Sequence, residues 1–157
     1  MKLIFMAIGK EHDSDIVTSI QQFTKRLSNY YKIEWIILPV PRNAAKMEVQ
    51  ELKRKEAELM LGKIRKEDYL VALDEHGKQL GSIELATFME ARAGQSVKQL
   101  VFLIGGAYGL GQAILDRANF KWSLSKLTFP HQLVRLILAE QVYRACTIIK
   151  NENYHHQ

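Results

Sequence analysis

The stretch "LIGGAYGLGQA", residues 103–113, combines an apolar run with a glycine turn that could bring backbone amides close to a ligand. Its glycines are Gly105, Gly106, Gly109 and Gly111. A strand, a glycine turn and a helix N-terminus often bind phosphate. The spacing argues against this, because Ile114 stands where a dinucleotide fingerprint starting at Gly109 needs Gly or Ala, and no Gly-Lys precedes Ser or Thr. The glycines therefore serve another ligand or only a tight turn.

The histidine and cysteine residues do not form a metal-binding pattern. His12 and His76 lack partners at metal-ligand spacing. The single cysteine, Cys146, excludes an internal disulfide and any multi-cysteine metal site. Core packing is expected for Cys146, and packing is also the favoured interpretation of His131. We expect no metal.

Length and charge bound the class of protein. A chain of 157 residues suits a single domain spanning residues 1–157, and the formal charge of +5 favours polyanionic partners, although a merely basic soluble protein fits as well. The apolar run Leu3–Ile8 is too short and too soon followed by charge for a signal peptide, and nothing approaches the length of a membrane span. We therefore expect a cytoplasmic protein with no membrane partner.

Apolar runs alternate with helical patterns along most of the chain. Strands are predicted at 3–8, 32–40, 68–74 and 98–105 and a brief one at the start of "KWSLSKLTF", with helices after a cap at Asp13 or Ser14 and at 44–66, 82–92 and 112–118. The third strand is predicted to be broken at "EHGK". This alternation is typical of an α/β fold with an open, mainly parallel sheet and flanking helices. Such sheets bind ligands at the carboxyl ends of their strands, here "LDEHGK" and "LIGGAYGLG".

A final helix of nearly twenty residues is predicted to open near Pro130, with Thr128 available as its cap. Its apolar residues crowd about half of the helical wheel: Val134, Ile137, Leu138, Val142, Ala145, Cys146, Ile148 and Ile149. Glu140, Arg144 and Thr147 make a polar strip. So wide an apolar surface predicts packing on the sheet and on a second subunit, as a homodimer; the alternative is burial within one subunit.

Five motifs, taken together, resemble a known family. They are "LDEHGK", "LIGGAYGL", "WSLSKLTFPHQLVR", "AEQVYRA" and "NENYHH". In wording and spacing they are similar to the ribosomal RNA large subunit methyltransferase H family of the SPOUT superfamily, over essentially the whole chain. The resemblance implies a deep trefoil knot near the C-terminus, a homodimer, S-adenosylmethionine as cofactor, and methylation of N3 of a pseudouridine in 23S ribosomal RNA within the large subunit or the 70S ribosome.

The resemblance also implies which residues bind the cofactor. They are Leu73, Gly105, Leu124, Ser125, Lys126, Leu127, Thr128 and Phe129. A neutral, flat adenine is served by apolar walls with backbone polar groups at its edge, which fits these residue types. The side chain of Lys126 is expected to face outward or toward RNA.

Catalytic roles for Tyr154 and His155 follow from the same resemblance. The N3 proton of a pseudouridine must leave before the nitrogen can attack, so a base or hydrogen-bond donors for the imide anion should lie near the methyl group. The family's usual ending has Pro where this chain has Asn153, and Lys or Arg where it has His156. Without the resemblance, this ending would be interpreted as a solvated terminus.

Arg135 and Arg144 are candidate RNA or interface contacts. Two other functions remain open from the sequence. One is a related knotted methyltransferase that acts on tRNA, and the other is a ribosome assembly factor that keeps the pocket without the chemistry.

Overall fold

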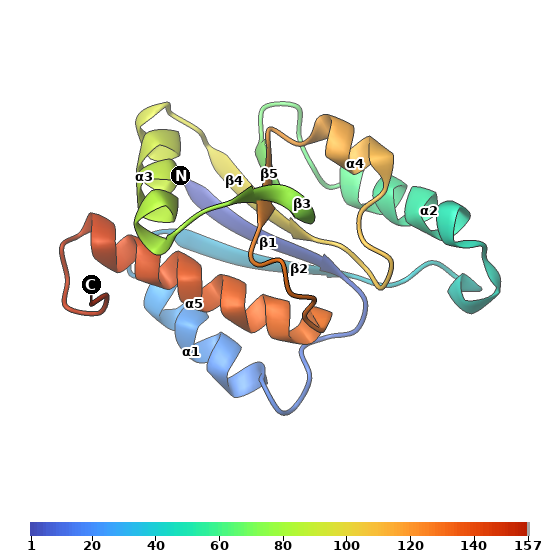
Figure 1. The fold of residues 1–157 in the computed structure, drawn as a ribbon, viewed down its shortest axis with the longest axis horizontal. Helices are drawn as coiled ribbons and strands as arrows, with labels where there is room; N and C mark the ends of the chain where they lie inside the picture. The colour runs from blue at the N-terminus through green and yellow to red at the C-terminus, as the bar shows by residue number, and fades with distance from the viewer. Residues whose placement is uncertain (157) are drawn as a thin grey trace.

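The computed structural model describes residues 1–156 and contains one five-stranded sheet in the order β2-β1-β4-β3-β5 (Figure 1). Its strands are β1 (Lys2–Ile8), β2 (Lys32–Leu38), β3 (Tyr69–Gln79), β4 (Gln99–Ile104) and β5 (Phe120–Ser123). Every pair of neighbouring strands is parallel, so all the carboxyl ends lie at the same edge. The open parallel α/β sheet predicted from the sequence is confirmed.

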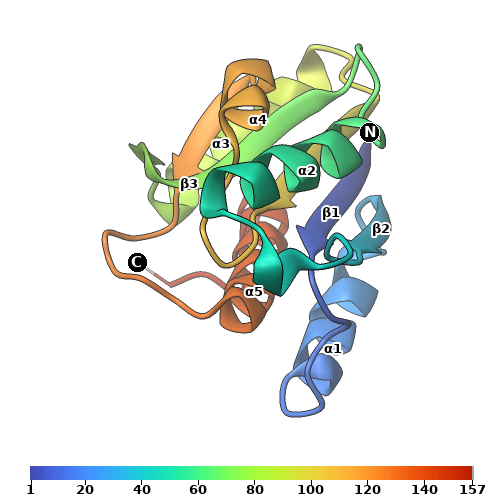
Figure 2. The same ribbon diagram turned by 90° about the vertical axis from the view of Figure 1, so that its right-hand side faces the viewer.

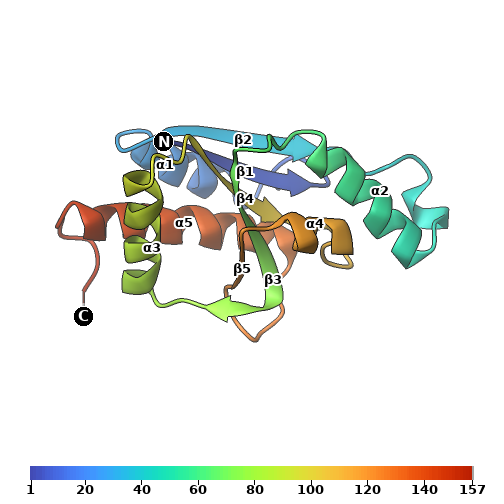
Figure 3. The ribbon, with the colours of Figure 1, turned by 90° about the horizontal axis from the view of Figure 1, so that it is seen from above.

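The alternation of side chains along each strand divides the core into two layers. In β1, Leu3, Phe5 and Ala7 pack against one layer of helices, and Ile4 and Met6 pack against the other. The first layer contains α1 (Val17–Leu27), α3 (Ser82–Gly94) and α5 (His131–Ile149), and the second contains α2 (Val49–Leu61) and α4 (Gln112–Arg117) (Figures 2 and 3). Because both faces of the sheet are covered, its strands are apolar runs rather than alternating ones.

Several element boundaries differ from the prediction. The segment predicted as one helix over 44–66 is a 3-10 turn at Ala44–Lys46 followed by α2, since Asn43 adopts a left-handed conformation (φ 59°) and Met47 is extended. Helix α1 begins at Val17, and Asp13 supports its start through its backbone carbonyl, which accepts from Val17 N at 2.9 Å. The predicted side-chain cap of this helix, at Asp13 or Ser14, is wrong for the residues the structure describes.

Helix α5 begins where predicted but is capped differently. Pro130 occupies the N-cap position, and Thr128 makes no capping hydrogen bond to the helix within residues 1–156. Thr147 is fully buried and donates to the carbonyl of Arg144 at 2.7 Å, so it is not part of the exposed polar strip that the helical wheel predicted. The prediction of core packing for Cys146 is confirmed, and burial raises the pKa of its thiol to about 12.

Arg135 is a buried structural residue rather than the surface contact that the sequence suggested. Only 1% of it is exposed, and its Nη1 donates to the carbonyl of Lys10 at 2.8 Å. The same atom lies 3.3 Å from Nδ1 of His12. Arg135 therefore links the loop after β1 to the first turns of α5.

Candidate functional site

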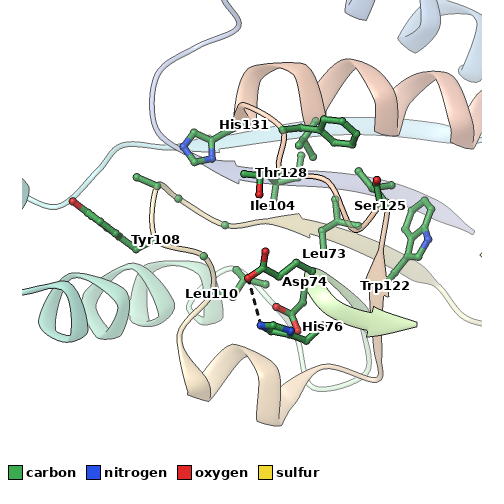
Figure 4. Close-up of a pocket in the computed structure, with 18 of the residues that line it drawn as sticks. Leu73, Asp74, His76, Ile104, Tyr108, Leu110, Trp122, Ser125, Thr128 and His131 are labelled. Carbon is green, nitrogen blue, oxygen red and sulfur yellow. Dashed lines mark ion pairs between the residues drawn. The ribbon is translucent and has the colours of Figure 1, made fainter. Parts of the chain in front are cut away.

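A pocket of about 520 Å³ opens at the carboxyl ends of β3, β4 and β5 (Figure 4). Three chain segments form most of its wall: the turn within β3, the glycine loop after β4, and the loop between β5 and α5. The first turn of α5 adds His131 and Val134 to the wall, α2 adds Lys53, and α4 adds Leu115. Its volume is in the range of ordinary small-molecule sites.

A bulge in β3 places polar side chains on the rim of the pocket. Pairing of β3 with β5 jumps from Leu73 to Lys78, both of which face Trp122. The residues between are displaced toward the pocket, where Asp74, Glu75 and His76 line it. The interruption predicted at "EHGK" therefore occurs as this bulge, while the strand itself continues to Gln79.

The glycine loop at residues 105–111 is closed by close backbone contacts. Gly109 donates to the carbonyl of Gly106 at 3.1 Å and has a positive φ of 82°, which favours glycine. A side chain on Gly111 would meet the carbonyl oxygen of Lys53 at 2.8 Å, and one on Gly106 would meet the carboxylate of Glu56 at 2.4 Å. The glycines thus permit a tight turn and the close approach of α2, and a role for them in binding a ligand stays a prediction.

The loop from Leu124 to Phe129 folds onto itself beside the glycine loop. The hydroxyl of Ser123 donates to the carbonyl of Ser125 at 3.0 Å, and the hydroxyl of Ser125 accepts from Leu127 N at 3.0 Å. These two bonds fix the loop where it forms the pocket wall. Leu127 remains 72% exposed.

Almost every residue predicted to bind the cofactor lies on this pocket. The residues on the wall are Leu73, Gly105, Leu124, Ser125, Leu127, Thr128 and Phe129. Lys126 is exposed and does not line the pocket, which agrees with the expected outward direction of its side chain. The role of these wall residues in cofactor binding stays a prediction. The three segments that the resemblance implied would form the site, at Leu73, at Gly105 and at residues 124–129, do line one pocket.

The structure adds wall residues that the sequence reasoning did not single out. Trp122 is 3% exposed, and its indole N–H has no hydrogen-bond partner within residues 1–156. Ile104 and Leu110 are buried apolar wall residues, and Tyr108 is an exposed one. The sequence did contain a signal for them, because Trp122 and Ile104 lie in the last residues of β5 and β4, and Tyr108 and Leu110 lie in the loop that follows β4. The carboxyl ends of strands form the ligand-binding edge of such sheets.

Tyr154 and His155 lie away from the pocket within the same chain. They follow the C-terminus of α5, whereas His131 and Val134 of its first turn line the pocket. The Tyr154 hydroxyl bonds to Glu140, which is nine residues after His131 in α5, so at about 1.5 Å per residue it lies about 14 Å along the helix axis from the first residue of α5. Neither Tyr154 nor His155 lines the pocket of its own chain.

The tail forms a polar cluster with Glu140 and Arg144 of α5. The Tyr154 hydroxyl donates to Glu140 Oε1 at 3.0 Å, and Nη1 of Arg144 lies 3.4 Å from Nδ1 of His155. The Arg144 guanidinium also lies 4.7 Å from the centre of the Tyr154 ring. Burial, and then the bond to Glu140, raises the pKa of Tyr154, so the phenol is a hydrogen-bond donor at neutral pH.

Neither a metal centre nor a membrane segment is found in the described part of the chain. No cluster of three His, Cys, Asp or Glu residues within residues 1–156 could hold a metal ion. Among the same residues, no helix has the length and apolar character to span a bilayer.

Comparison with known proteins identifies the family. A family described as predicted SPOUT methyltransferase matches residues 1–155. Proteins named ribosomal RNA large subunit methyltransferase H are also similar: that of Cytophaga hutchinsonii is 43% identical over 156 residues, covering 99% of this chain and 100% of the relative. Those of Parabacteroides distasonis and Flavobacterium johnsoniae are 41% and 43% identical, with full coverage of both chains. The chain belongs to the SPOUT methyltransferase family.

Proposed function

We propose that the protein is an S-adenosylmethionine-dependent methyltransferase that modifies N3 of a pseudouridine in 23S ribosomal RNA, acting on the assembled large subunit or 70S ribosome. The names of the full-length relatives support ribosomal RNA of the large subunit as substrate. The observation that carries the proposal is the pocket, where the bulge of β3, the glycine loop and the 124–129 loop meet around one cavity.

The wall of the pocket fits this cofactor. Leu73, Ile104, Leu110 and Phe129 supply apolar surface for a flat base, and the glycine loop supplies backbone N–H and C=O groups at its edge. Asp74 and Glu75 stand on the rim, where carboxylates favour a cationic ligand. When bound, the cofactor supplies a methyl group on a sulfonium, which is transferred by in-line displacement.

The catalytic unit in this proposal is a homodimer. Tyr154 and His155 do not line the pocket of their own chain, so in this proposal a second copy supplies them to the site. Exposed apolar residues near the pocket and along α3 and α5 support a subunit contact: Ile83, Leu127 and Leu133. Burying such residues is a common source of homodimer stability.

In such a composite site, the tail stabilises the substrate as it loses its proton. The Tyr154 hydroxyl is protonated at neutral pH, and by turning its one O–H away from Glu140 it can donate to a developing imide anion. Arg144, held by Glu140 through a 3.0 Å bond from its Nε, adds a fixed positive charge beside His155. The Tyr154 hydroxyl and the Arg144 charge both stabilise the imide anion of the pseudouridine more than its neutral form. Methylation at N3 requires this difference, because the nitrogen attacks after it has lost its proton.

The remaining parts of the proposal come from the family. We extend to this chain the deep trefoil knot near the C-terminus, a single domain over residues 1–157, and a cytoplasmic location beside the ribosome. Residue 157 lies outside the described residues. The net charge of +5 is compatible with a partner rich in phosphate.

A labelling experiment tests this function. Purified protein is incubated with methyl-labelled S-adenosylmethionine and, separately, with 70S ribosomes, 50S subunits, protein-free 23S ribosomal RNA and tRNA from a strain that lacks the enzyme. Label should enter ribosomes or large subunits, and mass mapping should place it on N3 of one pseudouridine. Label in tRNA, or in protein-free RNA but not in ribosomes, would contradict the substrate, and cofactor binding without any transfer would favour an assembly factor.

A further inference from the structure

Glu56 is a buried carboxyl group directly behind the glycine loop. It lies on the packed face of α2 with Leu52, Ala57 and Met60, which are all apolar. A side chain on Gly106 would meet its Oε2 at 2.4 Å and its Oε1 at 3.0 Å. Gly106 itself lines the pocket. The carboxyl group and the pocket therefore lie on two sides of one glycine residue.

This carboxyl group lacks the partners that buried acids usually have. Glu56 is 5% exposed, and its Oε1 is fully buried with no hydrogen-bond partner among the described residues. Burial alone raises the pKa of Glu56. An apolar residue of similar size would fill the position without the cost of burying a carboxyl group, so packing does not explain its presence.

Most charged groups on the surrounding elements are engaged elsewhere, and Lys53 has no ion pair among the described residues. On α2, Arg54 pairs with Glu58 and Lys55 with Glu51 along the exposed side, while Lys53 lines the pocket. On α4, Gln112 donates to Asp116 at 2.8 Å, and Arg117 donates to the carbonyls of Arg65 and Asp68 at 2.9 Å.

The bulge of β3 brings Asp74, Glu75 and His76 to the pocket rim, where Glu75 and His76 lie 3.4 Å apart. The glycine loop adds only Tyr108 as a titratable side chain. None of these groups is a cause of the raised pKa of Glu56. No fixed positive charge therefore balances an ionised Glu56 in the free protein.

We propose that Glu56 is a specificity-determining residue that ionises when a cationic methyl donor fills the pocket on the other side of Gly106. The inference rests on the proposed function, in which S-adenosylmethionine is that donor. Binding of the cation favours the carboxylate, so Glu56 releases one proton to solvent. After transfer, the product S-adenosylhomocysteine has a neutral sulfur, and the buried carboxylate no longer has its full counter-charge. Glu56 therefore favours binding of the donor over binding of the product.

Calorimetry with the full-length protein tests the proposal. S-adenosylmethionine and S-adenosylhomocysteine are titrated into wild-type protein, Glu56→Gln and Glu58→Gln, in buffers of different ionisation enthalpy. Glu58→Gln is the matched control, because it removes the same charge two residues away on the exposed side of α2. The wild-type protein and Glu58→Gln should release more protons on binding the donor than Glu56→Gln does.

The preference for the donor over the product should fall about tenfold in Glu56→Gln, which corresponds to one pKa unit of coupling. In the wild type, affinity for the donor should rise with pH, above the range in which an ordinary glutamate ionises, more steeply than in Glu56→Gln, since deprotonation of Glu56 favours the bound state.

Thermal unfolding separates this role from a structural one. Glu56→Gln and Glu56→Met should unfold at or above the wild-type temperature, because they remove an unfavourable buried acid. Lower stability with equal losses of donor and product affinity would indicate packing and overturn the proposal. Unchanged proton release and an unchanged preference in Glu56→Gln would overturn it as well. If the wild-type protein binds neither ligand, the cofactor assignment itself is wrong, and this inference fails with it.

Discussion

The hydroxyl of Tyr154 donates to Oε1 of Glu140 at 3.0 Å, which holds the end of the chain against the middle of α5. The same oxygen accepts from Nε of Arg144 at 3.0 Å. Asn153, where the family's usual ending has proline, is exposed. The tail thus has a defined position without the proline, because side-chain bonds to α5 hold it.

Tyr154→Phe tests whether the phenol acts on the reaction. The change removes one donor while the ring can keep its edge-on contact with Tyr143, at 4.8 Å between ring centres. Methyl transfer to ribosomes should fall about 10²-fold, as for loss of one donor to a developing anion. Affinity for S-adenosylmethionine, measured by calorimetry, should remain unchanged. Unaltered turnover would remove Tyr154 from the mechanism.

Mixed dimers test whether the tail acts on the pocket of the other subunit. Thr128 is exposed on the pocket wall, so Thr128→Trp should block the cofactor with little effect on folding. Each of Thr128→Trp and the double variant Tyr154→Phe/His155→Ala should be nearly inactive alone. Random mixing of the two by co-expression should restore about a quarter of wild-type activity, because half of the dimers then contain one intact composite site.

A control for this experiment is the chain that carries all three changes, co-expressed with Thr128→Trp. In that mixture no site is intact, and activity should stay at background. No recovery in the first mixture would mean that the tail does not act across subunits.

The sequence predicted the sheet and the location of the pocket, because both depend on local patterns. Apolar runs such as Leu3–Ile8 are buried on both faces, and the ends of the third and fourth strands had to lie at one edge. The burial of Arg135 could not be predicted, since an arginine between apolar residues on a helix usually extends to solvent. Only the position of the loop after β1 shows why its guanidinium is inside.

The packing of α2 on the glycine loop was also beyond the sequence. The resemblance assigned Gly105 to the cofactor, whereas the structure shows that Gly106 and Gly111 allow Glu56 and Lys53 to approach. The glycine loop and α2 are fifty or more residues apart in the chain, and a contact at that separation leaves no periodic pattern in one sequence.

Gly111→Ala tests this packing. Its new Cβ would lie 2.8 Å from the Lys53 carbonyl oxygen, a backbone atom that cannot rotate away. The free energy of unfolding, measured with urea, should fall by about 1–3 kcal/mol. Gly94→Ala is the matched control, since a Cβ there meets nothing within 4 Å at the end of α3. It should raise stability by up to about 1 kcal/mol. Equal effects of the two changes would contradict the packing described for α2.

His12 gives the stability of the protein a defined pH dependence. Burial and the charge of Arg135 lower the pKa of His12, whose ring packs edge-on against Trp35 at 4.8 Å. The unfolded chain therefore takes up a proton near about pH 6.5, while the folded protein does so only at lower pH. The stability contributed by neutral His12 is fully present above the pKa of the unfolded chain. It is lost as the pH falls from that value to the lower pKa of the folded protein.

Urea unfolding of wild-type protein and His12→Gln across this pH range measures the effect. The difference in unfolding free energy between the two should shrink as the solution is acidified from about pH 7.5 to pH 5.5. Taking the difference removes the opposite contribution of Glu56, whose raised pKa makes stability fall with increasing pH in both proteins. A difference that stays constant, or that grows on acidification, would mean that His12 is protonated as readily in the folded protein as in the unfolded chain, and that Arg135 does not act on it.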